Sequence, residues 1–246
     1  MTYKRERAFR GGFVAAAICA GLVLSGCGND KSETELPKLW GSLIKDIGSG
    51  VAEKVGARKG GKSGSATGAP ADPNAAVTAS LAATSGPIAL IVNEKTKGVS
   101  AMTPIQTNGD YVTWQAANKQ SLVLRKGVLT STRGLGEDLM ASKPGRATSA
   151  ILGKQKAAYR RSYFHLSGLA ETTELVVDCK VKPLQEDTVS VGEINEVATV
   201  MSETCRHSGS SLRIKNLYWV GKGGRILKSR QWVNSPVGYL VVQPLR

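Results

Sequence analysis

The chain has 246 residues, of which 41% are hydrophobic and 21% are charged. This composition excludes a chain that is disordered throughout and a protein with many membrane-spanning helices, and the length predicts one folded domain with appendages. Lysine and arginine number 33 against 19 aspartates and glutamates, so the formal net charge is +14. That charge favours anionic partners, a class that includes nucleic acid, phospholipid and acidic glycan.

Residues 1–26 have the pattern of a signal peptide. Four basic residues precede the uncharged stretch 13–24, which would rise only about 18 Å as a helix and is too short for a hydrocarbon core of roughly 30 Å. The segment ends in the sequence Leu24-Ser25-Gly26-Cys27, which resembles the processing box of bacterial lipoproteins, where the cysteine is acylated and becomes the new N-terminus. An ordinary signal peptide followed by an incidental cysteine is the alternative.

Acylation of Cys27 predicts a mature protein that is held on a membrane. Two or three acyl chains, at about 0.8 kcal/mol per buried CH₂, hold a protein on a bilayer where one chain would not. In similar lipoproteins an aspartate directly after the cysteine favours the inner membrane, and this chain has Gly28 there. We therefore expect an outer-membrane lipoprotein that faces the periplasm, a location that argues against a nucleic-acid partner.

Residues 27–55 are expected to form a polar tether and an amphipathic helix. Apolar residues recur there at the spacing that places them on one helical face; they are Leu36, Leu39, Trp40, Leu43, Ile44 and Ile47. The helix either packs against the folded body or lies on the nearby bilayer or on a partner.

Residues 56–75 are rich in glycine, alanine, serine and proline, which predicts a flexible linker. Within it, residues 56–63 read G-A-R-K-G-G-K-S, a formal match to the phosphate-binding loop. That loop works between a buried strand and a helix N-terminus, and neither flank fits here. We expect no nucleotide or other cofactor at this segment.

Residues 76–246 are expected to form a mainly β domain, an antiparallel barrel or sandwich. Short β-type runs alternate with turn residues, without long helices between them. The expected strands are 88–92, 111–114, 121–125, 128–132, 161–166, 174–182, 198–205, 212–220, 225–233 and 239–243. Lys126-Gly127 is expected to turn one hairpin, residues 136–142 are expected to form a helical turn, and 193–197 is a second candidate for one.

Cysteine usage predicts a disulfide. Once the signal peptide is removed and Cys27 is acylated, Cys179 and Cys205 are the remaining cysteines in an oxidising compartment. Closing a loop of about 26 residues would stabilise the fold by roughly 3 to 4 kcal/mol. Two buried free thiols are the alternative, and a metal site with His165 and His207 is not expected because the spacings match no zinc motif.

One strand offers a candidate glycan-binding face. Side chains two residues apart share a face of an extended strand, so Lys228, Arg230 and Trp232 are expected to lie together. Cations could bind the carboxylates of an acidic sugar chain, and the indole could cover a pyranose ring. The alternative is a core tryptophan beside solvated cations. A second basic cluster, Lys154, Lys156, Arg160 and Arg161, is interpreted as a solvated loop.

Three stretches carry a family resemblance. They are Trp114 to Leu139, Arg161-Ser162-Tyr163, and Asn216 to Val220 followed by Gly224-Arg225 and by Ser229 to Trp232. Together they resemble the YjbF family, the group 4 capsule polysaccharide lipoproteins, over roughly residues 76–243. The resemblance implies a β-barrel-like fold, an outer-membrane lipoprotein and a role in making or exporting extracellular polysaccharide, and it implies no catalytic residues.

The function expected from these observations is a non-catalytic accessory of capsule or exopolysaccharide production or export. Its expected partners are the membrane, an acidic polysaccharide and polysaccharide-export proteins. A general envelope scaffold without glycan contact is the alternative. A polysaccharide-modifying enzyme is less expected, because such an enzyme needs a positioned pair of carboxylates, whereas aspartates and glutamates are scattered along this chain.

Overall fold

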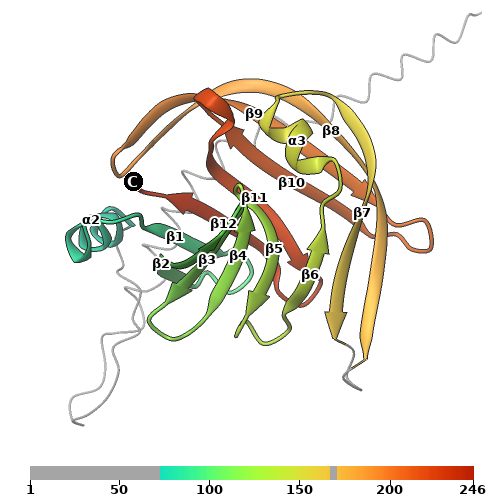
Figure 1. Ribbon diagram of the computed structural model, residues 1–246, viewed down its shortest axis with the longest axis horizontal. Helices are drawn as coiled ribbons and strands as arrows, with labels where there is room; N and C mark the ends of the chain where they lie inside the picture. Colours follow the sequence, from blue (N-terminus) through green and yellow to red (C-terminus); the bar gives the residue numbers. More distant parts are fainter. Residues whose placement is uncertain (1–72, 167–170) are drawn as a thin grey trace, which may run out of the picture. The chain divides into compact units, whose positions relative to one another are not determined.

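The structure of the protein is a computed structural model that describes residues 73–166 and 171–246. Figure 1 shows an antiparallel sheet that curls into a nearly closed barrel, which confirms the prediction of a mainly β, barrel-like fold. The signal peptide 1–26 with Cys27, the expected tether and amphipathic helix of 27–55 and all but the last three residues of the expected linker lie outside the described residues.

Twelve strands make up one sheet, and every neighbouring pair is antiparallel. The first half of the chain provides β1 (Ala89–Asn93), β2 (Val99–Asn108), β3 (Tyr111–Ala116), β4 (Ser121–Arg125), β5 (Val128–Arg133) and β6 (Leu139–Lys143). The second half provides β7 (Ala157–Leu166), β8 (Thr172–Val191), β9 (Ile194–Arg206), β10 (Arg213–Val220), β11 (Ile226–Asn234) and β12 (Gly238–Pro244).

The sheet is closed by its first and last strands and remains open at one seam. β1 pairs with β12, while β5 and β6, consecutive in the chain, are the two edge strands (Figure 1). Side chains bridge this seam: the Leu139 N–H donates to Thr132 Oγ1 over 3.0 Å, and Arg133 Nη1 donates to the Leu139 carbonyl over 3.3 Å. Polar edge groups are thereby satisfied without a continuous ladder.

The expected helical turn at 136–142 is wrong, because residues 134–138 form a loop that leads into strand β6. Gly134 and Gly136 have φ values of 81° and 95°, which a right-handed helix excludes. The Asp138 carboxylate accepts the backbone N–H groups of Gly134 and Leu135 over 2.8 and 3.1 Å. A side chain therefore supplies the hydrogen bonds that a helical turn would have made.

The second candidate for a helical turn, 193–197, is also wrong. Val191 pairs with Ile194, so Gly192 and Glu193 form a two-residue hairpin loop and β9 starts at once. Gly192 has a φ of 63°, and a Cβ at this position would lie 2.6 Å from the Leu245 carbonyl oxygen. The loop thus needs glycine both for its backbone conformation and for its close approach to the C-terminal segment. The expected hairpin turn at Lys126-Gly127 is confirmed, with both residues at positive φ.

Two α-helices accompany the sheet in the described residues, and the sequence reasoning anticipated neither. Helix α2 (Pro73–Ala83) begins with proline, and five of its eleven residues are alanine, a composition that favours a helix over the linker and β structure expected there. Helix α3 (Ala147–Leu152) buries Ala147, Ala150 and Ile151. These residues pack against Val181, Met201 and Tyr218, so α3 covers one end of the barrel interior.

A polar layer crosses the barrel between two apolar clusters. On β7, Arg161 lies two residues from Tyr163 of the larger cluster and two residues from Tyr159, which packs against the smaller one. On β9, Glu203 lies in the same way between Cys205 and Met201. Because side chains two apart share a face, these strands place a charged residue in the interior at the same level.

Arg161 and Glu203 form a fully buried ion pair. The distance from Arg161 Nη1 to Glu203 Oε2 is 2.8 Å, and the two side chains are 1% and 0% exposed. Glu203 also accepts hydrogen bonds from Tyr159 (2.8 Å), Tyr218 (3.0 Å) and Asn216 (2.7 Å). Burial raises the pKa of both tyrosines above the ordinary value, so their hydroxyls stay protonated and donate to the carboxylate.

Arg161 also ties the free edge of β5 to the barrel interior. Its Nη2 donates to the Leu129 carbonyl over 3.2 Å, and its Nε donates to Ser142 Oγ of β6 over 3.3 Å. The Leu129 N–H donates to Gln231 Oε1 over 2.7 Å, and Gln231 Nε2 donates to the Gly127 carbonyl over 2.9 Å. Arg161 is therefore a structural residue of the interior and not part of the solvated basic loop expected from the sequence.

Cys179 and Cys205 form a disulfide between directly paired positions of β8 and β9. Both cysteines are buried in the larger apolar cluster. The bond joins strands that are already neighbours, and in the chain-entropy model its closure of a 26-residue separation stabilises the fold by about 3 to 4 kcal/mol.

Replacing Arg161 with methionine is expected to lower the free energy of unfolding by about 3 to 5 kcal/mol, because Glu203 would remain as a buried charge without its counter-ion. The matched control is Arg160→Met, which breaks an exposed pair with Asp178 and is expected to cost no more than about 1 kcal/mol. Urea denaturation followed by circular dichroism measures both. Equal losses in the two variants would contradict the assignment of the interior pair.

Candidate functional site: the pocket at the barrel mouth

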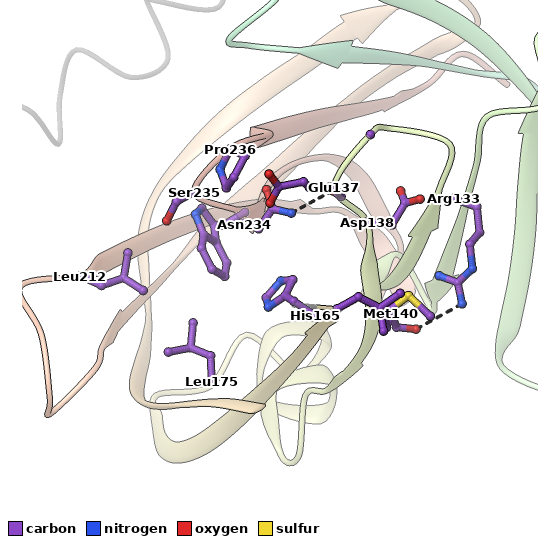
Figure 2. Close-up of a pocket in the computed structure, with 13 residues that line it drawn as sticks. Arg133, Glu137, Asp138, Met140, His165, Leu175, Leu212, Asn234, Ser235 and Pro236 are labelled. Carbon is purple, nitrogen blue, oxygen red and sulfur yellow. Dashed lines mark hydrogen bonds between the residues drawn. The ribbon is translucent and has the colours of Figure 1, made fainter. Parts of the chain in front are cut away.

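A pocket of about 750 Å³ lies at the end of the barrel away from α3 (Figure 2). The first residue of β7, Ala157, packs with the cluster under α3, whereas the last two residues of the same strand line the pocket. The other walls come from the β5–β6 loop, β6, the start of β8, the segment before β10 and the β11–β12 hairpin. The lining residues are Arg133, Gly136, Glu137, Asp138, Met140, His165, Leu166, Leu175, Leu212, Trp232, Asn234, Ser235 and Pro236.

Aromatic side chains form the inner wall of the pocket. Trp232 is 5% exposed and meets the Tyr163 ring edge to face at 5.0 Å between centroids. His165 meets Trp232 at 5.9 Å with an interplanar angle of 82°, and its Nε2 lies 3.0 Å from the Val233 carbonyl oxygen. Since a carbonyl can only accept, Nε2 carries the hydrogen of this bond. The ring orientation is therefore fixed.

The polar rim is held by its own hydrogen bonds. Asn234 Nδ2 donates to the Glu137 carbonyl over 2.8 Å, and Asn234 Oδ1 accepts the Val237 N–H over 2.7 Å. The first bond, which Figure 2 shows, ties the β5–β6 loop to the β11–β12 hairpin across the mouth, and the second shapes the hairpin turn itself. Asp138 also accepts from Thr132 Oγ1 over 2.9 Å, in addition to its two loop N–H groups.

The arrangement suits binding better than acid–base chemistry. A preformed pocket with aromatic and aliphatic walls and a few fixed polar groups is the usual composition of a ligand site. Both oxygens of Asp138 accept hydrogen bonds that shape the loop, and Nε2 of His165 is bonded to the backbone. These two residues hold the walls in place.

The structure does not bring the three predicted glycan-contact residues to one surface. Trp232 lines the pocket and packs on Tyr163 inside the barrel. Lys228 and Arg230 contact different neighbours, Trp219 and Tyr239. The strand alternation that would align all three is interrupted near Trp232, where the β11–β12 register is irregular and the Trp232 N–H donates to the Asn216 side chain over 2.8 Å.

Arg230 is engaged in intramolecular contacts. Its guanidinium makes a bidentate pair with Glu94, with distances of 2.7 and 2.8 Å, and it donates to the Lys215 carbonyl over 2.9 Å. It also stacks at 3.5 Å from the Tyr239 ring centroid. This geometry links β11 to the end of β1 and leaves Arg230 little capacity for an external carboxylate.

Lys228 is buried against an indole. It is 5% exposed, and its Nζ lies 4.2 Å from the centroid of the Trp219 ring. The Trp219 Nε1–H donates to Asp187 over 2.7 Å. Burial lowers the pKa of Lys228 to about 7, and the nearby Asp187 carboxylate opposes that shift. Lys228 therefore belongs to the packing between β8, β10 and β11.

Among the described residues, one cluster brings together side chains of the kinds that bind metals: Cys179, Cys205 and Glu203. Its two sulfurs are bonded to each other, and its carboxylate is paired with Arg161. Sulfurs in a disulfide are not the thiolate ligands that a transition metal needs, so this cluster does not fit a metal.

A comparison with known protein families identifies the family of this chain. The model for the family described as "Group 4 capsule polysaccharide lipoprotein gfcB, YjbF" matches residues 65–245. The chain belongs to the YjbF family. The resemblance seen in three stretches of the sequence is thus confirmed, and the family description identifies a capsule-associated lipoprotein. No curated protein sequence matches the chain.

Two solved structures are similar to the chain. The hypothetical lipoprotein YmcC from Escherichia coli K12 aligns with a TM-score of 0.60 and 15% identity, over 71% of this chain and 90% of that one. A putative lipoprotein from Parabacteroides distasonis aligns with a TM-score of 0.27 and 8% identity, over 66% and 95%. The likeness to YmcC shows a shared fold. Neither helix in the described part of the YjbF-family chain has the length and apolar character needed to cross a membrane.

The family stretches mostly mark the barrel interior and the site. Arg161, Asn216 and Tyr218 belong to the buried polar layer, and Trp232 reaches the pocket. Sequence reasoning missed His165 as a pocket residue because a lone histidine near a strand end carries no motif. Its spacing of two from Tyr163 was the available signal, since it places both rings on one strand face.

The contribution of Lys228 to stability is expected to depend on pH. Its folded-state pKa of about 7 lies below the unfolded value of 10.5, so between these values the unfolded chain binds a proton that the folded chain does not. The free energy of unfolding of the wild type relative to Lys228→Met should therefore rise from pH 7 to pH 9.5. Urea titrations over this range measure the difference. A difference that stays flat for Lys228→Met over this range would contradict the expectation.

Proposed function

We propose that the mature protein is an outer-membrane lipoprotein, anchored through Cys27 and facing the periplasm, that acts as a non-catalytic accessory in the production or export of capsule or exopolysaccharide. The observation that carries this proposal is the family match over residues 65–245, which covers the whole barrel. The sequence Leu24-Ser25-Gly26-Cys27 supports the anchor. Polysaccharide-export proteins are its expected protein partners.

The pocket at the barrel mouth is the proposed contact point for a segment of polysaccharide. Its wall combines the Trp232 indole with leucine side chains, which suits the CH faces of sugar rings. Its rim carries backbone and side-chain polar groups that could bond hydroxyls. Because Asn234 ties the two rim loops together, the pocket is rigid before any ligand arrives, which lowers the entropic cost of binding.

A non-catalytic role is supported by how the polar groups of the pocket are used. Asp138 accepts three hydrogen bonds within its own loop. Catalytic carboxylates of glycosidases instead face each other across the scissile bond, where one of them must hold or take a proton. The Asp138 contacts make this residue a loop-shaping acceptor, which supports a binding role for the pocket.

Deletion of the gene is expected to reduce surface polysaccharide, and the wild-type gene is expected to restore it. The decisive variant is Ser235→Trp, which places an indole in the pocket from an exposed loop position and should fail to restore surface polysaccharide. The control is Ser190→Trp, an equally large change at an exposed position of β8, which should restore it. Quantitative staining of extracted polysaccharide measures each strain, with immunoblots showing equal protein levels.

Three outcomes would each contradict part of this proposal. Unchanged surface polysaccharide in the deletion strain would favour a general envelope scaffold. Full restoration by Ser235→Trp would remove the pocket from the function while leaving the accessory role in place. Shortened chains in a mixture of purified protein and polysaccharide would point to an enzyme.

The anchor is expected to depend on one residue. Cys27→Ala should abolish acylation, so the protein should leave the membrane fraction. Without acyl chains, the uncharged stretch 13–24 is the remaining apolar segment of the signal peptide, and it is too short to span a bilayer. Mass spectrometry of the wild-type N-terminal peptide should show an acylated Cys27. Sucrose-gradient fractionation should place the wild type in the outer membrane, and an unmodified Met1 would refute the lipoprotein assignment.

A further inference from the structure

Exposed cations gather on the outer surface of β7 and β8 at the end of the barrel near α3. We define the basic face as Lys154 and Lys156 of the α3–β7 loop, Arg160 of β7, and Lys180 and Lys182 of β8, all of which are exposed. Figure 1 shows β7 and β8 side by side along this part of the barrel wall, and the ladder register confirms it. Among the described residues, Lys154, Lys156 and Lys180 form no ion pair with a carboxylate.

The strand register points the side chains of Arg160, Lys180 and Lys182 to the outer side of the barrel. Ala157 pairs with Val181, and Val181 is buried in the cluster under α3. Lys182 follows Val181 on β8, so it projects from the opposite, outer side, as Lys180 does, and Lys156 directly precedes β7 and is exposed. Lys180 pairs with Ala158 on one side and with Thr204 of β9 on the other, so its neighbours on the rung are small and uncharged.

The charges of Lys154, Lys156 and Lys180 are not balanced by a carboxylate of the residues that the structure describes. Asp178 forms an ion pair with Arg160 over 3.2 Å, and Arg206 stands opposite Asp178 on the other ladder, so this one carboxylate has an arginine on each side. Like charges on neighbouring strand positions repel each other, and this surface therefore carries an electrostatic cost in the free protein. An anionic ligand would remove that cost, and it would gain charge-assisted hydrogen bonds from several cations at once.

We infer that the basic face binds a carboxylate-bearing stretch of polysaccharide, at a site separate from the pocket at the barrel mouth. This inference rests on the proposed function for the source of the ligand. Arg160, Lys180 and Lys182 stand on a grid whose spacing is set by the sheet, about 6.6 to 7 Å between alternate residues of a strand and about 4.8 Å between strands, and Lys154 and Lys156 lie in the loop that precedes β7. A polymer with a carboxylate on each repeat can engage several points of such a grid.

A polymer matches the basic face better than a membrane surface does. Surfaces that lie on lipid insert apolar side chains among their cations. The residues interleaved with the basic face are Ala158, Asp178 and Thr204, none of which provides such an anchor. The exposed apolar residues Leu166 and Val176 lie further along β7 and β8, toward the barrel mouth.

The test measures binding of the full-length lipoprotein in detergent micelles to polygalacturonate, a polymer of carboxylated sugars, with neutral dextran as the uncharged comparison. The triple variant Lys154→Gln/Lys156→Gln/Lys180→Gln is expected to lose at least about tenfold in affinity for polygalacturonate, because it removes three charge-assisted contacts. The matched control removes the same charge elsewhere, with Lys97→Gln/Lys119→Gln/Arg213→Gln at exposed positions, and should change the affinity less than about twofold.

The remaining outcomes each decide the matter. An equal loss of affinity for polygalacturonate in both triple variants would show a response to net charge and would overturn the site. Equal affinity of the basic-face triple variant and the wild type would also overturn it. Binding to phosphatidylglycerol vesicles through the same three lysines, without binding to polygalacturonate, would assign the face to the membrane and overturn the inference. The proposed function is judged separately, by surface polysaccharide in the deletion strain, so failure of one is distinguishable from failure of the other.

Discussion

The buried pair between Arg161 and Glu203 is the constraint on which the rest of the barrel depends. Two charges removed from water are tolerated only where each is paired and every remaining polar atom finds a partner. Glu203 receives three further donors and Arg161 reaches four acceptors, which come from β5, β6, β9 and β10. Any strand that shifts its register by one residue turns its member of this network out of the interior. The pair thus specifies which strands surround it and at what level.

That requirement also explains how the barrel tolerates an incomplete seam. β5 and β6 do not pair, because the loop of 134–138 takes a conformation fixed by glycines at positive φ and by the Asp138 carboxylate. The edge groups of Leu129 are satisfied instead from the interior, by Arg161 and Gln231. The same loop forms one wall of the pocket, so the feature that interrupts the sheet is the feature that builds the mouth.

Local sequence signals foresaw the parts of this structure that depend on neighbours in the chain. The β-type runs predicted most strands of the sheet. Local backbone preference predicted the Lys126-Gly127 turn, and the disulfide between Cys179 and Cys205 followed because these are the cysteines that remain in the mature chain. The sequence did not predict the buried ion pair, because Arg161 looks like one more exposed cation beside Arg160 until its partner on β9 is known. The sequence indicated Trp232 but not the direction of its side chain, because the strand alternation that would align it with Lys228 and Arg230 is interrupted where the β11–β12 register is irregular.

The proposed roles place two kinds of contact at opposite ends of one strand. Lys156 immediately precedes β7, and His165 near its other end lines the pocket, which at strand geometry separates them by about 30 Å. A single sugar could occupy one of these places, whereas a chain of many sugars could reach both, crossing the rim from the charged outer wall to the aromatic mouth. Two weak contacts on one polymer bind far more tightly than either alone, because the second contact forms at a high effective concentration. A rigid barrel on a lipid tether would then need no catalytic group to hold and orient a growing or passing polysaccharide.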